Sequence, residues 1–508
     1  MPSQINQKTV AKNTLMLYIR MGVMMIVSLY ASRVILATLG VNDFGIYNVV
    51  GSVVVMFSFM NITLTLAIRR FLAYELGQEN SGRIQKVFNA SIIAVFVVSI
   101  IIVLGLESIG LWFLNNKLNI PPDRLGAANF IFQFSILSFF FNMFLIPFNS
   151  AIVVYEKMGV YAYLGVAEAL LKLGLVLSIP FLPGDKLQWY GLLIALLSIF
   201  MAVCNVLYCN IKIIKPKDFR ESGWKDVAPI FRFSAWTVFG TMIFMLATQG
   251  INMIYNVFFG VAINAALGIA QQVANATNQF IGNFQTAFNP QLTKSFSAEG
   301  LSQKTFGFVC QTSRLSILLI LIIGVPIIIN VSPILELWLK TVPDFAVPFT
   351  VIFILYVAID GASGPLYFLV YAKGDLKMYQ ITLGIIQLAY VVLVYVLCML
   401  GLTPIYVLSL YVIAGIVIYV TRLIILRKIM KFPVQNFINR VIIPLLIPIL
   451  LFLIIGIANN SFFSDNGMLI ILSKIVLTII VVSLISFYVY LNKDERQFVY
   501  SLIKAKIN

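Results

Sequence analysis

The first two apolar runs of the chain meet in the stretch Ser32-Arg33-Val34-Ile35-Leu36-Ala37-Thr38-Leu39-Gly40-Val41-Asn42-Asp43-Phe44-Gly45-Ile46-Tyr47. It closes one apolar run, turns at a glycine and opens the next run, and it places Arg33 within the first of them. A guanidinium at that depth of a membrane costs at least about 2.5–3.5 kcal/mol on insertion scales, so such a residue normally faces a bundle interior, a water-filled cavity or an anion. The stretch therefore predicts a helical membrane protein whose first helix turns a cation away from lipid.

The composition of the whole chain agrees with this prediction. Of the 508 residues, 61% are hydrophobic and 11% are charged, whereas about 25% are charged in soluble proteins. Apolar runs of roughly 20–25 residues, each long enough to cross a ~30 Å hydrocarbon core as a helix, recur along the chain. They predict an all-α polytopic membrane protein with about fourteen transmembrane helices, at residues 15–39, 46–68, 87–113, 127–153, 158–182, 188–211, 231–257, 263–287, 306–330, 347–371, 378–400, 404–426, 440–458 and 467–490.

The basic residues determine the predicted orientation. A net charge of +16 would suggest nucleic acid as the partner of a soluble chain, but here most lysines and arginines fall in alternate connections, which is the positive-inside pattern. We therefore expect no nucleic-acid partner, a multi-pass location in the bacterial inner (plasma) membrane among membrane lipids, and both termini in the cytoplasm. The polar segment 1–13 precedes a span longer than the apolar core of a signal peptide, so we expect no cleavage.

Several classes of chemistry lack the residues that they need. The chain has no histidine, which excludes histidine-based acid–base catalysis and histidine metal sites. Its four cysteines all lie within predicted spans and show no metal-site or disulfide spacing. The outer connections are too short for a catalytic domain. We therefore expect no enzyme activity, no metal and no cofactor.

A weak internal repeat predicts two similar halves. A shift of 220 residues aligns Leu39-Gly40-Val41, at the end of the first span, with Phe259-Gly260-Val261, just after the seventh span. Six helices per copy is an even number, so the two lobes would share one orientation and face a central cavity. The predicted boundaries are an N-terminal six-helix lobe at 1–214, a cytoplasmic linker at 215–230, a C-terminal six-helix lobe at 231–432, and two additional helices with a cytoplasmic tail at 433–508.

The basic side chains inside the spans fall into two groups according to their predicted depth in the membrane. Arg33 and Lys172 lie deep and are candidates for binding an anionic group of a substrate. Glu168 lies one turn before Lys172, which leaves open an ion pair within the helix or a lysine that faces the cavity. The alternative for Arg33 is a bond to backbone carbonyls or to a carboxylate such as Glu107. The remaining four lie toward span ends, where snorkelling to the interface explains them: Arg20, Arg314, Arg422 and Lys474.

Two groups of polar residues fall within the C-terminal half. Asp360 lies mid-span beside glycines and a proline that can interrupt a helix. It is interpreted either as a coupling site for Na+ or H+ or as a structural, hydrogen-bonded aspartate. Amide side chains follow one face of the spans 231–257 and 263–287, where they either line a hydrated path for a hydroxyl-rich substrate or bond between helices: Gln249, Asn252, Asn256, Gln272, Asn275 and Gln279.

The chain resembles the polysaccharide (O-antigen type) flippases of the multidrug/oligosaccharidyl-lipid/polysaccharide exporter superfamily, which also includes the MATE transporters. The resemblance covers the whole chain and rests on the layout of spans and on short motifs: Ser32-Arg33-Val34-Ile35, Leu39-Gly40, Phe44-Gly45-Ile46-Tyr47, Arg70-Phe71 and Gly77. It implies alternating-access export of an undecaprenyl-diphosphate-linked oligosaccharide, a surface polysaccharide precursor, from the cytoplasmic to the outer leaflet. Other polysaccharide-assembly membrane proteins are candidate partners.

The resemblance fits the chemistry of the candidate residues. A diphosphate is a suitable ligand for Arg33 together with Lys172, and sugars are suitable ligands for the amides. The alternatives are a multidrug exporter or a lipid II flippase of the same superfamily, and an integral-membrane glycosyltransferase or polymerase. The cation-exporting branch typically carries an acidic residue in helix one, but no carboxylate precedes Asp43 here. A glycosyltransferase generally needs catalytic carboxylates or a sizeable outer loop.

Overall fold

The computed structural model describes residues 7–77, 81–216, 224–339, 341–373, 376–462, 468–493 and 495–497, and within these ranges the chain is helical without strands. It divides into two compact units, residues 1–265 and 266–508. The all-α polytopic prediction is confirmed. Eleven described helices are long and apolar enough to cross a membrane, or twelve if one bent pair counts as a span.

Each of the fourteen predicted spans coincides with helix in the described residues. The number of predicted spans exceeds the twelve apolar helices for two reasons. The first two spans form one continuous stretch, Arg20–Leu76. The eighth, in α10 (Val261–Glu299), is missing from the apolar set because its asparagines and glutamines lower its hydropathy. A helix too polar for lipid has to be covered by protein or water.

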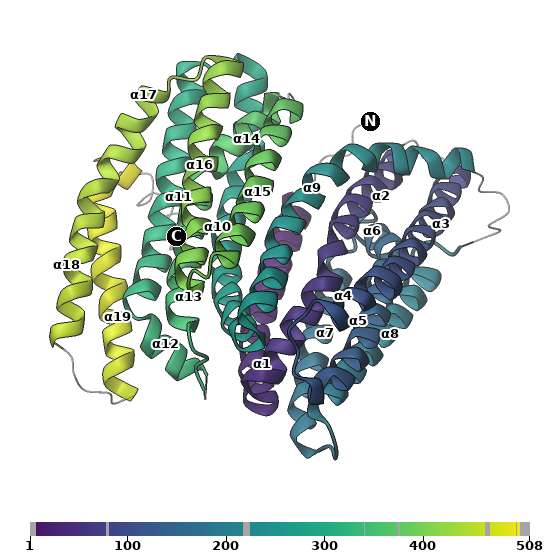
Figure 1. Cartoon of the computed structure of the whole chain (residues 1–508). Helices are drawn as coiled ribbons and strands as arrows, with labels where there is room; N and C mark the ends of the chain where they lie inside the picture. The colour runs from purple at the N-terminus through teal and green to yellow at the C-terminus, as the bar shows by residue number, and fades with distance from the viewer. Residues whose placement is uncertain are drawn as a thin grey trace. The chain divides into compact units, whose positions relative to one another are not determined.

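The first unit packs around α1. α1 lies against α7, α5 against α8, and both α2 and α3 lie against α9 (Figure 1). Its helices are α1 (Gln7–Val55), α2 (Phe59–Gly77), α3 (Ser81–Gly105), α4 (Leu111–Asn116), α5 (Leu125–Phe144), α6 (Ile146–Val154), α7 (Met158–Ser178), α8 (Lys186–Lys212), α9 (Trp224–Phe259) and the beginning of α10, with short 3-10 or π segments between some of them.

The glycine of the opening stretch turns the chain as the sequence predicts. Gly40 has φ 76° and kinks α1, and Gly260, its match under the 220-residue shift, has φ 81° between α9 and α10. This left-handed conformation strains any residue with a Cβ. The two turns also meet, because a Cβ on Gly45 would lie 1.9 Å from the carbonyl oxygen of Val261.

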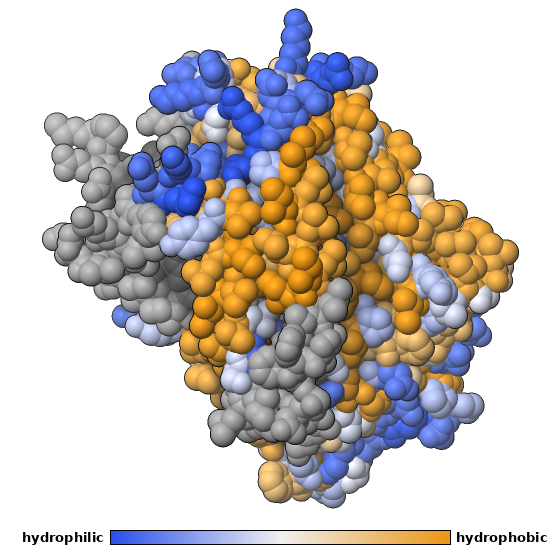
Figure 2. Space-filling model, turned by 90° about the vertical axis from the view of Figure 1, so that its left-hand side faces the viewer, coloured by the Kyte–Doolittle hydropathy of each residue, from blue (hydrophilic) through white to orange (hydrophobic). Residues whose placement is uncertain are grey.

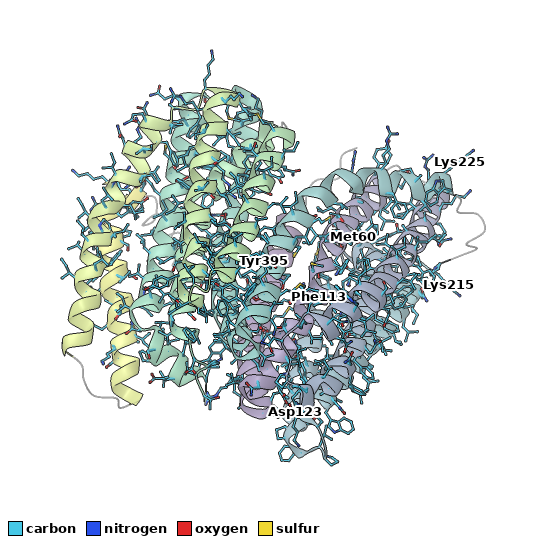
Figure 3. All side chains as sticks on the ribbon, in the orientation of Figure 1. Met60, Phe113, Asp123, Lys215, Lys225 and Tyr395 are labelled. Carbon is cyan, nitrogen blue, oxygen red and sulfur yellow. The ribbon has the colours of Figure 1, made fainter. Side chains whose placement is uncertain are left out.

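The first unit extends beyond the predicted lobe 1–214. The chain divides after Ala265, rather than in the linker at 215–230, because α9 packs against α1, α2 and α3. Residues 217–223 of that linker lie outside the described residues. Figure 3 shows Lys215 and Lys225 on the right-hand side of this unit and Asp123 at its lower left, so these two lysines lie well away from the aspartate.

The second unit contains the rest of α10 and the remaining helices. These are α11 (Gln303–Ile329), α12 (Val331–Trp338), α13 (Ala346–Ala362), α14 (Gly364–Lys373), α15 (Leu376–Met399), α16 (Pro404–Met430), α17 (Val434–Phe437), α18 (Leu446–Phe462) and α19 (Met468–Ile485). α13 and α14 form one span that is bent by 43°, so the predicted interruption beside Asp360 is confirmed. Figure 2, which faces the side that carries α18 and α19, shows a hydrophobic belt between hydrophilic ends.

The two additional helices are fastened to the second unit by a buried arginine. α19 packs against α11, and Arg314 of α11 donates to Glu495 and to the backbone oxygens of Arg440 and Tyr490. Depth alone predicts that Arg314 snorkels to the interface, but the side chain is buried. Sequence cannot find this pair because 181 residues separate its members.

Candidate functional site

A polar stripe runs along one face of α7 in the first unit. Its residues recur at intervals of three and four, so their side chains lie above one another. α7 packs against α1, which brings Arg20 to this face. The term α7 stripe is used below for four residues of α7 together with Arg20 of α1 and Arg69 of α2. The four are Tyr161, Gly165, Glu168 and Lys172.

Arg20 is held against α7. Its Cζ lies 4.2 Å from the ring centroid of Tyr161. An added Cβ on Gly165 would lie 2.2 Å from Nε of Arg20, so the glycine makes room for the guanidinium. That Nε is buried and has no hydrogen-bond partner within the described ranges. Depth alone predicts snorkelling for Arg20, but a tyrosine and a glycine on α7 keep it within the unit.

Arg69, near the middle of α2, adds a second guanidinium. Its charge and that of Arg20 both act on Tyr161, and its Nε is likewise buried without a partner among the residues that the structure describes. Sequence reasoning missed Arg69 because it adjoins Arg70 at the end of a span, where basic pairs are typical of the interface. One end of the stripe therefore has two guanidinium groups with unused N–H donors.

Glu168 and Lys172 are neighbours without a direct ion pair. The charges of Lys172 and Arg20 both act on the carboxylate of Glu168, yet no described residue forms a direct ion pair with it. Lys172 is half-buried, and Arg33 is half-buried on α1, roughly 20 Å further along the helix than Arg20. Glu168 therefore lies within electrostatic range of both Lys172 and Arg20, and Arg33 lies at a second level of the same unit.

The predicted amides of α9 belong to a buried network. Asn256 donates from Nδ2 to Oδ1 of Asn264 at 3.0 Å and accepts at Oδ1 from the backbone N–H of Asn119 at 2.8 Å. Asn264 donates to the backbone oxygen of Asn252 at 2.7 Å, and Asn252 donates to Gln249 at 3.3 Å. Asn256 is fully buried. The amide of Asn256 therefore bonds between α9 and α10, whereas the amide of Asn252 bonds to Gln249 within α9 and its backbone oxygen accepts from α10.

The predicted amides of α10 have a different environment. Asn275 and Gln279 are exposed, and Gln272 is half-buried with an Oε1 that has no partner among the described residues. The three recur at intervals of three and four, so they form one face of the helix. Because lipid cannot satisfy exposed amides, this face has to meet water or a polar ligand.

Asp360 is paired with an arginine. Nη1 of Arg422 donates to Oδ1 of Asp360 at 3.0 Å and also to the hydroxyl of Ser363 at the bend between α13 and α14. Arg422 is therefore engaged within the unit, where depth alone predicts snorkelling. The guanidinium of Arg422 already supplies the positive charge that Na+ would bring to Asp360. The aspartate side chain nevertheless remains 41% exposed. Within the described ranges, no group of three or more Cys, Asp or Glu side chains is arranged to hold a metal ion.

An apolar groove of about 710 Å³ lies in the second unit. It is formed by α11, α13, α16 and α18, and its lining includes Ile320, Ile359, Ile416, Tyr419, Phe452 and Leu453. Helix α18, which belongs to the two additional helices, closes one side of it. Such a surface suits a hydrocarbon chain better than a polar ligand.

A clamp formed by Arg124, Asp43 and Asp185 ties three elements of the first unit together. Arg124 donates from Nε and Nη2 to both carboxylate oxygens of Asp43 at 2.8 and 2.5 Å, and from Nη1 to Asp185 at 2.6 Å. Asp185 also caps α8 by accepting from the N–H of Leu187 at 2.9 Å. Partial burial pushes the pKa of Asp185 up, but the hydrogen bonds and the charge of Arg124 outweigh burial and hold it below its usual range.

Known structures share this architecture, although no protein-family model and no curated protein matches the chain. The lipid II flippase MurJ in an inward closed conformation is 17% identical, covers 92% of this chain and 97% of its own, and has a TM-score of 0.69. An inward-facing multidrug resistance MATE transporter of the MOP superfamily is 12% identical over 82% of this chain and 99% of its own, with a TM-score of 0.64. The MATE transporter VcmN of Vibrio cholerae in its bent form is 11% identical over 85% of this chain and 100% of its own, with a TM-score of 0.54. The chain therefore has the fold of these membrane transporters.

Proposed function

We propose that this protein is a flippase that moves an undecaprenyl-diphosphate-linked oligosaccharide from the cytoplasmic to the outer leaflet of the bacterial inner membrane by alternating access. The observation that carries the proposal is the α7 stripe, because it gathers Arg20, Arg69 and Lys172 in one helical bundle. Cations within a membrane span are expensive unless they serve an anion or a path. A diphosphate is the anion of this lipid class.

The chemistry of the stripe suits a diphosphate. Guanidinium groups present planar forks of N–H donors that match phosphate oxygens, and charge-assisted bonds of this kind are about twice as strong as neutral ones. Nε of Arg20 and Nε of Arg69 are buried without acceptors among the described residues. A buried donor without an acceptor is costly, so an anionic ligand supplies what these groups lack. Arg33 remains a candidate for binding the same diphosphate at a second position along its path.

Other features agree with a lipid-linked oligosaccharide. The exposed amides of α10, Gln272, Asn275 and Gln279, are suited to sugar hydroxyls. The apolar groove of the second unit is suited to the prenyl chain. Asp360 stays a candidate site for a coupling Na+ or H+. Such an ion would have to compete with the guanidinium of Arg422 for the carboxylate.

Transport in vesicles tests the proposal. Purified protein is reconstituted with a fluorescent undecaprenyl-diphosphate oligosaccharide, and its movement between leaflets is followed by quenching from outside. We expect Arg20→Ala and Lys172→Ala to slow the movement at least about tenfold, the effect of losing roughly 1.4 kcal/mol of a charge-assisted bond. Arg83→Ala is the matched control, because Arg83 is 69% exposed and pairs with Glu75 outside the stripe. Equal rates for all three variants and the parent would refute the assignment.

A second candidate is a lipid II flippase, which is favoured by the likeness to MurJ. Lipid II carries the same diphosphate, so the α7 stripe does not separate the two substrates. The same vesicles are therefore offered lipid II and, as a third cargo, a cationic dye. Preferential movement of lipid II would select this candidate, and movement of the dye alone would select a multidrug exporter.

A further inference from the structure

The bend between α13 and α14 gathers oxygen atoms within a membrane span. Pro365 has no N–H, so the carbonyl oxygen of Gly361, four residues earlier, lacks its usual partner in the helix. Nε2 of Gln285 on α10 donates to that oxygen at 2.6 Å. The hydroxyl of Ser363 donates to the backbone oxygen of Asp360 at 2.7 Å. Interrupted helices of this kind are where secondary transporters coordinate Na+ or H+.

One nitrogen of Arg422 lies where two of these side-chain oxygens converge. Nη1 donates to Oδ1 of Asp360 at 3.0 Å and to Oγ of Ser363. Because Oγ of Ser363 gives its own proton to the backbone oxygen of Asp360, it meets the guanidinium with a lone pair. Carboxylate and hydroxyl oxygens are also the kind of ligand that a hard cation takes. The guanidinium therefore occupies the place of a bound cation.

The pair of Arg422 and Asp360 differs from two other arginine pairs of the chain. Arg314 donates from Nε, Nη1 and Nη2, and its partner Glu495 is 5% exposed. Arg124 also uses all three nitrogens, on two aspartates. The bonds of Arg422 to the bend both start at Nη1, and its Nε is buried without a partner among the described residues. A single nitrogen thus neutralises an aspartate whose side chain stays partly exposed.

A carboxylate at this depth needs a positive partner. An isolated charge within the membrane is costly, and Na+, a proton or a basic side chain can remove that cost. Na+ and protons come from solution, whereas Arg422 is attached to α16, which packs against both α13 and α14. Two cations at one carboxylate repel each other, so the guanidinium keeps Na+ away for as long as it holds Asp360.

We propose that the bend contains a latent Na+ site whose cation is supplied by Arg422. In the parent protein the guanidinium takes the oxygens of Asp360 and Ser363, so no Na+ binds there. Once the guanidinium is removed, the same two oxygens become ligands for Na+, and water completes the coordination. This role of Arg422 removes Na+ from the candidate coupling ions at Asp360, and it holds whichever substrate the protein carries.

Equilibrium binding of radioactive Na+ to the full-length protein in detergent tests the proposal. Mildly alkaline pH keeps a freed carboxylate ionised, and choline replaces Na+ in the blank. We expect Arg422→Met to bind Na+ at one site with a Kd at least about tenfold lower than that of the parent, because a like charge has left the site. The double variant Arg422→Met, Asp360→Asn should lose this binding together with the carboxylate.

Arg427→Met is the matched control. Arg427 is an exposed arginine in the last turn of the same helix, and its variant should bind Na+ as the parent does. Where Arg422→Met does not fold, Arg422→Gln carries the test, because its amide is polar but uncharged. Unfolding temperatures in Na+ and in choline are a second readout. Na+ should raise the unfolding temperature of the Arg422 variants and leave that of the parent unchanged, since only a bound ion stabilises the folded state.

Two results would overturn the latent site: Na+ binding by the parent that Asp360→Asn abolishes, or Arg422 variants that bind Na+ no more tightly than the parent. The vesicle assay separates this from the flippase proposal. If Arg422→Met gains Na+ binding but the parent moves no lipid-linked cargo, the role of Arg422 stands and the proposed substrate is wrong. If the parent moves the cargo and the Arg422 variants gain no Na+ binding, the flippase proposal stands and the latent site is wrong.

Discussion

Arg314 of α11 and Glu495, which follows α19 in the chain, form an ion pair with 2.8 Å between Nε and Oε2, and only 7% and 5% of their side chains are exposed. The same guanidinium lies over the ring of Tyr490, with Cζ 4.5 Å from the centroid. Glu495 and Asn492 also exchange backbone-to-side-chain hydrogen bonds of 2.9 Å. One arginine therefore fixes the position of the two additional helices, one of which borders the apolar groove.

Glu495→Ala should destabilise the protein by about 3–5 kcal/mol, because it leaves a buried guanidinium without its counter-ion. Thermal unfolding in detergent measures the change. The double variant Arg314→Met, Glu495→Leu should recover most of the loss, since it removes both charges. Lys493→Ala, at an exposed neighbour of the pair, is the control. A double variant as unstable as Glu495→Ala would show that the pair is not the cause.

Gly165→Ala should slow transport while the protein still folds. The new Cβ would lie 2.2 Å from Nε of Arg20, and since an arginine head is mobile, the guanidinium should move away from Tyr161. We expect a fall in transport of about 10-fold or more, equivalent to a lost charge-assisted bond of at least roughly 1.4 kcal/mol. Gly174→Ala on the same helix is the control, because nothing lies within 4 Å of its added Cβ. Equal transport by the two variants would contradict the placement of Arg20.

Asn256→Ala should lower stability by about 2–3 kcal/mol, because Oδ1 of Asn264 and the N–H of Asn119 lose their partner in a buried place. Denaturation monitored by tryptophan fluorescence measures the loss. Asn275→Ala, at an exposed amide of α10, should keep the stability of the parent. If Asn256→Ala unfolds as the parent does and only transport changes, the amide contacts the substrate rather than the α9–α10 turn.

The clamp formed by Arg124, Asp43 and Asp185 should weaken as the pH falls. The pKa of Asp185 in the folded protein is below its ordinary value of 3.8, so its contribution is fully present above 3.8 and is lost as the pH drops through the lower, folded value. Asp185→Asn should therefore destabilise the protein by about 1 kcal/mol at neutral pH, and by progressively less in acid. Unfolding midpoints between pH 7 and pH 3 measure this. A constant difference between variant and parent would contradict the effect of Arg124 on this carboxyl.

The class of the protein and the course of its spans could be predicted from the sequence. Apolar runs report the secondary structure of a membrane protein directly, because hydrocarbon forces every backbone polar group into a helix. Gly40 and the bend beside Asp360 were predictable for a related reason: glycine tolerates positive φ, and glycine and proline interrupt a helix. Lys172 and Glu168 were found because one helix carries both.

Which polar side chains meet could not be predicted, because it depends on how the helices pack. Arg20 and Arg69 reach Tyr161 from other helices, Arg314 and Arg422 find carboxylates 181 and 62 residues away, and Asn256 is enclosed by the α9–α10 turn. Depth in a span is readable from sequence, but the direction of a side chain toward a particular neighbour depends on how helices pack. For that reason the sequence identified a cation-bearing first helix, while the packing of α1 against α7 brought Arg20 to Tyr161 and Gly165.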